Sequence, residues 1–221
     1  MKKSISLFAA ALLTVLSISL SSCLKEDNTE YPDVVATNDT IHGTLRYKQP
    51  ESTGGAVVAW PYGEAKIKLI AGAFDVISEA TVNADGTFSL VLPGKVSGGY
   101  LSSLQDIAYS QAGTVLATPN TVRVLTAFQY RVDSTFGNES KSMNTNLYLL
   151  KSDFTISKSY FFNFYDMDGT FAGTSYTGNV FNWNFKKGWG MIESVVTNTD
   201  GNIFSSKSVA SAASGAVWVN M

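Results

Sequence analysis

Cysteine and histidine are almost absent from this chain: its 221 residues include one of each, Cys23 and His42. A single thiol excludes a disulfide within the chain and an all-cysteine metal site, and a single imidazole excludes sites that need two histidines. Charged residues are also few, at 15%, and the formal net charge is -2. Because phosphate binding needs a basic surface, we expect no nucleic-acid partner.

A stretch without charge lies near the N-terminus. Lys2 and Lys3 precede it, it runs over residues 5–20, and it ends at two small residues and Cys23. The stretch is shorter than the roughly 20 residues of a membrane-spanning helix. Residues 1–22 are therefore predicted to be an export signal peptide.

The residues around the single cysteine resemble a bacterial lipobox. In Leu20-Ser21-Ser22-Cys23 a leucine and two small residues precede the cysteine. The resemblance implies that Cys23 is diacylated and becomes the new N-terminus, and each buried acyl methylene then contributes about 0.8 kcal/mol to membrane binding. The alternative is a plain secretory signal followed by an ordinary buried thiol.

The segment after Cys23 is charged and then polar. Residues 24–28 resemble the acidic export tag of Bacteroidota lipoproteins, which implies the outer leaflet of the outer membrane, facing the cell exterior. The alternative is a solvated tether that carries no address. Residues 23–40 are predicted to be a lipidated N-terminus and a flexible stalk.

The rest of the chain favours strands, because β-branched or alternating runs are separated by Gly, Asn and Asp. We predict an all-β fold of two consecutive β-sandwich-like domains, over residues 41–118 and 119–221, with one short helical turn at 101–108. The expected strands are 41–47, 56–60, 66–70, 76–82, 87–92, 121–132, 146–150, 159–165, 180–186, 191–197 and 216–220.

Turn chemistry and alternation add local detail. Asp85-Gly86 predicts a tight hairpin, since Gly accepts the positive φ of such turns, and Asp168-Gly169 and Asp200-Gly201 are expected to repeat it. Three rows of alternate apolar residues are expected in the core. They are Phe88, Leu90 and Leu92; Tyr160, Phe162 and Phe164; and Phe181, Trp183 and Phe185.

The first β region resembles carboxypeptidase-regulatory-like and prealbumin-like sandwich modules. The similarity lies in Ile41-His42-Gly43-Thr44-Leu45, in Ala56-Val57-Val58 and in Asn83-Ala84-Asp85-Gly86-Thr87-Phe88-Ser89-Leu90. It covers about a third of the chain and implies a role in adhesion, assembly or spacing, without catalysis. The second region is similar to uncharacterised lipoproteins of the same bacterial group.

Loop aromatics are the candidate ligand-binding residues. Trp60 and Tyr62 flank Pro61, and Trp189 stands between two glycines, so all three are candidates for projecting from turns and stacking on sugars. The alternative is that they fold back onto the core. Asp166 and Asp168 resemble the start of a calcium loop, but the carboxylates expected later in such a loop are missing, and a plain turn is the alternative.

No cofactor is expected, because a haem site would need His42 together with Met143, Met167 or Met191 from the other predicted domain. No Ser-His-acid or P-loop pattern occurs either. The sequence therefore predicts a surface-exposed, lipid-anchored protein that is a non-enzymatic binding or structural accessory of the outer membrane. Its partners would be the membrane, through the lipid, and an extracellular glycan or an outer-membrane protein. The alternative is a glycan-binding lipoprotein of a polysaccharide-uptake system.

Overall fold

The computed structural model describes residues 32–53, 55–72, 74–111, 113–125, 128–136, 139–153, 155–197 and 203–220. Cys23, the predicted signal peptide, the stalk up to residue 31 and the Asp200-Gly201 turn lie outside these residues. The prediction that the stalk extends over residues 32–40 was wrong, because Val34 is only 8% exposed and its strand pairs with Lys95–Val96. The described part is almost entirely strand, so the predicted all-β class is confirmed. Among the described residues, no helix has the length and apolar character needed to cross a membrane.

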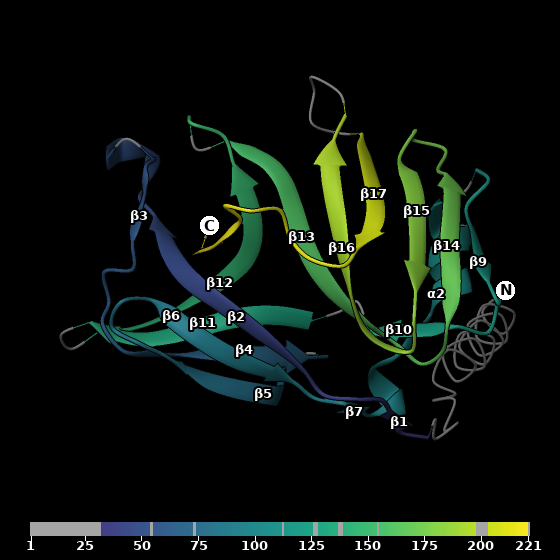
Figure 1. Ribbon diagram of the computed structural model, residues 1–221, viewed down its shortest axis with the longest axis horizontal. Helices are drawn as coiled ribbons and strands as arrows, with labels where there is room; N and C mark the ends of the chain where they lie inside the picture. Colours follow the sequence, from purple (N-terminus) through teal and green to yellow (C-terminus); the bar gives the residue numbers. More distant parts are fainter. Residues whose placement is uncertain are drawn as a thin grey trace, which may run out of the picture. The chain divides into compact units, whose positions relative to one another are not determined.

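Eighteen strands, one α-helix and two 3-10 turns make up the described part (Figure 1). They are β1 (Val34–Val35), β2 (Asp39–Lys48), η1 (Glu51–Thr53), β3 (Val57–Ala59), β4 (Ala65–Ala71), β5 (Asp75–Val82), β6 (Thr87–Leu92), β7 (Lys95–Val96), η2 (Gly98–Tyr100), β8 (Ser102–Ser103), α2 (Leu104–Gln111), β9 (Leu116–Thr118), β10 (Arg123–Leu125), β11 (Phe128–Phe136), β12 (Glu139–Leu150), β13 (Ile156–Tyr165), β14 (Gly169–Thr174), β15 (Val180–Phe185), β16 (Gly188–Val196), β17 (Phe204–Val209) and β18 (Val217–Asn220).

Seven of these strands close into a ring. The order is β11-β4-β5-β6-β2-β18-β12, and β11 pairs with β12 to complete it. The sheet then continues from β12 through β13, β16, β17, β15 and β14 to β9, and this open part curves beside α2 (Figure 1). Because each strand of the ring pairs with a neighbour on both sides, closure removes free strand edges along most of the circumference.

The predicted boundary between residues 118 and 119 does not separate two units. Residues Pro32–Met221 form one compact unit. Three ring strands, β11, β12 and β18, come from beyond residue 119, and they pair with strands from the first half: β11 with β4, and β18 with β2. The two predicted sandwich regions are therefore parts of one continuous sheet, because strand pairing between distant segments joins them.

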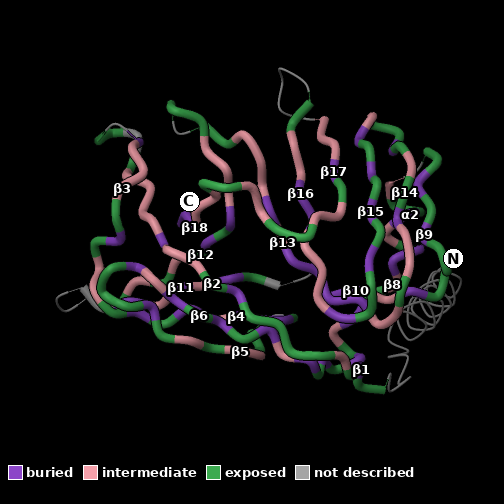
Figure 2. Tube along the Cα trace, in the orientation of Figure 1, coloured by how far each residue is buried: buried purple, intermediate pink, exposed green. Residues whose placement is uncertain are grey.

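The core lies where the sequence alternation places it. Phe88, Leu90 and Leu92 from the ring pack in one core cluster with Tyr160 and Phe162 from β13. The open sheet and α2 enclose a second cluster that includes Phe181, Trp183 and Phe185, and exposed residues alternate with these along β15 (Figure 2). All three predicted core rows are confirmed, since Phe164 is also fully buried.

The Asp-Gly turns behave differently from one another. At Asp85-Gly86 the glycine has φ +87°, and the Asp85 carboxylate accepts the Thr87 N–H at 2.9 Å, as predicted. Gly169 does not have a positive φ, and Asp168 accepts the backbone N–H of Lys187 at 2.9 Å instead. The expectation that Asp168-Gly169 repeats the same hairpin was wrong, because the acid caps the neighbouring β15–β16 connection.

Candidate functional site

The two predicted surface tryptophans are engaged inside the protein. Trp60 is only 5% exposed, belongs to the ring core and donates its indole N–H to the Gly63 carbonyl at 2.7 Å. Trp189 is partly buried and donates to the Pro93 carbonyl at 2.9 Å, while its ring packs edge-on against Phe164. Of the two alternatives that the sequence left open, folding back onto the core is therefore the one observed for both residues, because each indole finds an acceptor and an apolar surface within the fold.

Tyr62 has a different position, at the end of the ring. Its ring contacts Trp60 and Tyr47 edge-on, with centroids 5.0 and 5.2 Å apart, and the Lys141 ammonium lies 5.3 Å from its centroid. Burial, together with the neighbouring Tyr47 hydroxyl, raises the pKa of Tyr62 to about 12. Its phenol therefore remains a neutral hydroxyl at physiological pH.

A cavity of about 320 Å³ adjoins Tyr62, and we call it the Tyr62 pocket. Its lining residues are Tyr47, Lys48, Gln49, Pro50, Tyr62, Lys141, Met143 and Asn220. They come from β2, β12, β18 and the loops that flank β3, so this end of the ring brings together residues that are far apart in the chain.

The floor of the Tyr62 pocket contains an amide whose hydrogen bonding is incomplete. Asn220 is 6% exposed, and its Nδ2 donates to the Met143 sulfur at 3.4 Å. Its Oδ1 has no hydrogen-bond partner within the described residues, and neither does the Oγ1 of the adjacent Thr145. Buried polar atoms normally have a partner, so these two oxygens are unusual, but both are shielded from solvent.

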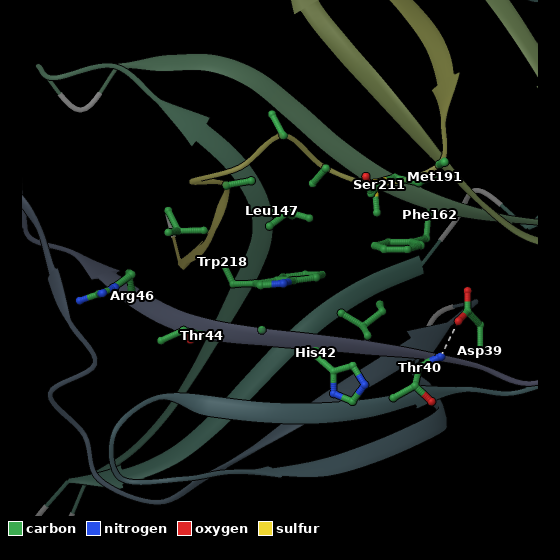
Figure 3. Close-up of a pocket in the computed structure, with 17 residues that line it drawn as sticks. Asp39, Thr40, His42, Thr44, Arg46, Leu147, Phe162, Met191, Ser211 and Trp218 are labelled. Carbon is green, nitrogen blue, oxygen red and sulfur yellow. Dashed lines mark hydrogen bonds between the residues drawn. The ribbon is translucent and has the colours of Figure 1, made fainter.

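A larger cavity, of about 630 Å³, lies beside the first half of β2, and we call it the β2 groove (Figure 3). Leu147, Phe162 and Trp218 form its apolar wall, and Met191 and the small residues of the 210–216 segment complete that side. His42 and Met191, two of the residues considered for haem, both border the groove. Figure 3 places them on opposite sides of β2, so they do not face one another as an axial pair would.

The 210–216 segment is fixed to β13 through Tyr160. The Tyr160 hydroxyl accepts the Ala213 N–H at 3.2 Å and donates to Glu193 at 3.1 Å. Glu193 also pairs with the Lys158 ammonium at 2.8 Å. Burial by itself would raise the pKa of Glu193, but hydrogen bonds from Lys158 and Tyr160 outweigh it and lower that pKa. The carboxylate thus stays ionised at neutral pH and holds the wall of the groove.

The two calcium candidates are occupied by cationic side chains. Asp166, with 8% of its side chain exposed, pairs with Arg123 at 3.0 Å and also accepts the Arg123 backbone N–H. Asp168 pairs with Lys186 at 2.8 Å. Within the described ranges, no group of three or more acidic, histidine or cysteine side chains gathers as a metal site would require.

The sequence predicted Tyr62 but missed its neighbours. Tyr47, Lys141, Met143 and Asn220 sit on strands whose partners cannot be deduced locally. Asn220 alone carried a signal in the sequence. It lies on the same strand face as the apolar Trp218, and a buried polar residue at such a position is informative about function. Comparisons with known proteins add nothing further: no family model, no curated protein and no solved structure matches the chain.

Proposed function

We propose that this chain is a surface-exposed, lipid-anchored protein that serves as a non-enzymatic binding or structural accessory of the outer membrane. The lipid anchor rests on the lipobox-like Leu20-Ser21-Ser22-Cys23 and on the charged residues that follow it. The binding role rests on the Tyr62 pocket, where the rings of Tyr47 and Tyr62 and the Lys141 ammonium come together.

The anchor is tested by metabolic labelling with a palmitate analogue. Wild-type protein should incorporate the label and fractionate with the outer membrane, because the acyl chains make membrane association nearly irreversible. Cys23→Ser should incorporate none. Labelling that persists in Cys23→Ser, or a native protein that is soluble and carries no fatty acid, would refute the anchor.

A glycan is the second candidate, and the composition of the Tyr62 pocket favours it. Aromatic rings stack on the CH faces of sugars, while amide oxygens and an ammonium bind hydroxyl groups. Tyr47 and Tyr62 supply the rings, and Gln49 and Lys141 supply the polar groups. This arrangement replaces the predicted Trp60 and Trp189 as the aromatic part of such a site.

A glycan array separates the two candidates. If the pocket binds sugar, Tyr62→Ala should lose binding to the glycans that wild-type protein retains. Tyr176→Ala is the matched control, since Tyr176 is 87% exposed and lies outside the pocket. If wild-type protein binds no glycan but co-purifies with outer-membrane proteins, the accessory role is favoured and the glycan role fails.

A further inference from the structure

The ring of seven strands is closed by β18 over only part of the length of β2. β18 pairs with β2 in parallel from Leu45 to Tyr47 and with β12 on its other side. The opposite edge of β2 pairs with β6 from Asp39 to Thr44. On the β18 side, however, no strand of the described residues pairs with β2 before Leu45, and the β2 groove lies along this stretch (Figure 3).

Backbone hydrogen-bonding groups of β2 point into this gap. Leu45 donates its N–H to Gly86, on the β6 side, at 2.8 Å. Successive residues of a strand point their backbone groups to opposite edges, so those of Thr40 and His42 point toward the groove. The Asp39 carboxylate accepts the Thr40 N–H at 2.7 Å, in the place where a neighbouring strand would otherwise bond.

The opposite side of the groove leaves room for a backbone. Its 210–216 segment consists of small residues, with Ala210, Ser211, Ala212, Ala213 and Ala216 lining the cavity. The apolar side chains of Leu147, Phe162 and Trp218 lie along the same side (Figure 3). A six-residue strand is about 17–20 Å long, so the free edge of β2 matches one short peptide segment.

We propose that the β2 groove binds an extended segment of a partner protein, which adds a strand to the edge of β2 between Asp39 and Thr44. The added segment lies along the same edge of β2 as β18. It pairs with the residues of β2 that β18 does not reach and so completes the closure of the ring. Because the Asp39 carboxylate already accepts the Thr40 N–H, main-chain hydrogen bonds to the Thr40 carbonyl and to both backbone groups of His42 supply the affinity, as in other cases of strand addition. The preferred segment alternates small apolar residues, directed at Phe162 and Trp218, with polar residues directed at solvent.

The proposal is independent of the lipid anchor and of the Tyr62 pocket, and the two cavities have no lining residue in common. Its first test is selection of a phage-displayed library of random seven-residue peptides against the full mature chain. We expect enrichment of peptides in which apolar and polar residues alternate. No enrichment over a library panned on bare support would overturn the proposal.

Two variants then separate backbone from side-chain recognition, with a fluorescein-labelled copy of the most enriched peptide as probe. His42→Pro removes the N–H that points into the groove and should weaken binding about tenfold or more, since it also leaves a peptide carbonyl unpaired. His42→Ala keeps that N–H and should bind within about threefold of wild type. The backbone groups of the even-numbered residues of β2 do not point toward β6. Neither substitution at His42 therefore removes a hydrogen bond between β2 and β6.

A third variant tests the groove independently, in case His42→Pro fails to fold. Ala212→Phe fills the groove from the opposite side and should also weaken the probe tenfold or more, with an unchanged circular dichroism spectrum. Equal binding by wild type, His42→Pro and Ala212→Phe would overturn the proposal. A wild-type dimer that dissociates in His42→Pro would also overturn it, because the groove would then belong to a second copy of the chain.

Discussion

Closure of the ring depends on a glycine that lets β2 approach a tryptophan. Gly43 faces the ring core, where a Cβ atom would lie 2.6 Å from the Trp218 Nε1 and 2.8 Å from the Phe88 Cζ. Both distances are shorter than any normal contact, and both rings are buried and packed edge-on against each other. Gly43→Ala therefore forces Trp218 or β2 to move.

The size of the effect follows from two opposing contributions. Overpacking a close-packed core costs about 1–3 kcal/mol, and the upper end applies because the neighbouring atoms belong to two rigid rings. Replacing glycine also restricts the unfolded chain, which stabilises the native state by about 0.4–1 kcal/mol. The net loss should be about 2 kcal/mol in the free energy of unfolding. For a domain of this size, that corresponds to a fall in Tm of about 4–8 °C.

Thermal and urea unfolding of the purified variants measure this loss, followed by circular dichroism. Gly99→Ala is the matched control, because a Cβ there meets only the Ser97 Oγ, at 3.8 Å, and the variant should be as stable as wild type or slightly more so. The penalty at Gly43 should shrink by about 1 kcal/mol in a Trp218→Phe background. A Gly43→Ala protein as stable as wild type would refute the close approach of β2 to Trp218.

Three further predictions concern polar contacts. Asp166→Ala should lower the free energy of unfolding by about 3 kcal/mol, because it leaves the largely buried Arg123 guanidinium without its carboxylate. Asp168 is exposed, so Asp168→Ala should cost less than about 1 kcal/mol. Equal losses in urea unfolding, or a rise in Tm on adding calcium, would contradict both assignments. The lowered pKa of Glu193 stabilises the fold above pH 4.5, and this contribution fades as the pH falls below that value, so Glu193→Gln should flatten the Tm profile there. An unchanged profile would argue against its pairing with Lys158. Tyr160→Phe should cost about 1–2 kcal/mol in urea unfolding, since its hydroxyl serves two partners, and a neutral result would contradict that network.

Some parts of the structure were predictable because their causes are local. Alternation along β6, β13 and β15 placed nine side chains in the core, and the glycine of Asp85-Gly86 set the β5–β6 hairpin. The strands that were missed lack such patterns. β14 begins with Gly169 and contains Gly173, and half of the residues of β17 are serine, so neither strand alternates clearly.

The candidate site residues were also predicted only in part. The aromatic residues around Pro61 suggested a ligand site, and Tyr62 does line a pocket. The same reasoning also offered Trp60 and Trp189 as surface candidates, but their indole N–H groups bond to the Gly63 and Pro93 carbonyls within the fold. Residue type indicates what a side chain is able to bind, but the nearest available acceptor decides where it points.

The sequence by itself determined the all-β class, the positions of most strands and the identity of the core rows, because these follow from side-chain alternation and turn chemistry over a few residues. Only the tertiary structure decided which strands are neighbours. β18, four residues near the C-terminal end of the sequence, inserts between β2 and β12, and this one pairing closes the ring, brings Asn220 to the Tyr62 pocket and leaves the β2 groove open. Pairing between distant strands depends on the packing of the whole chain, and no local pattern encodes it.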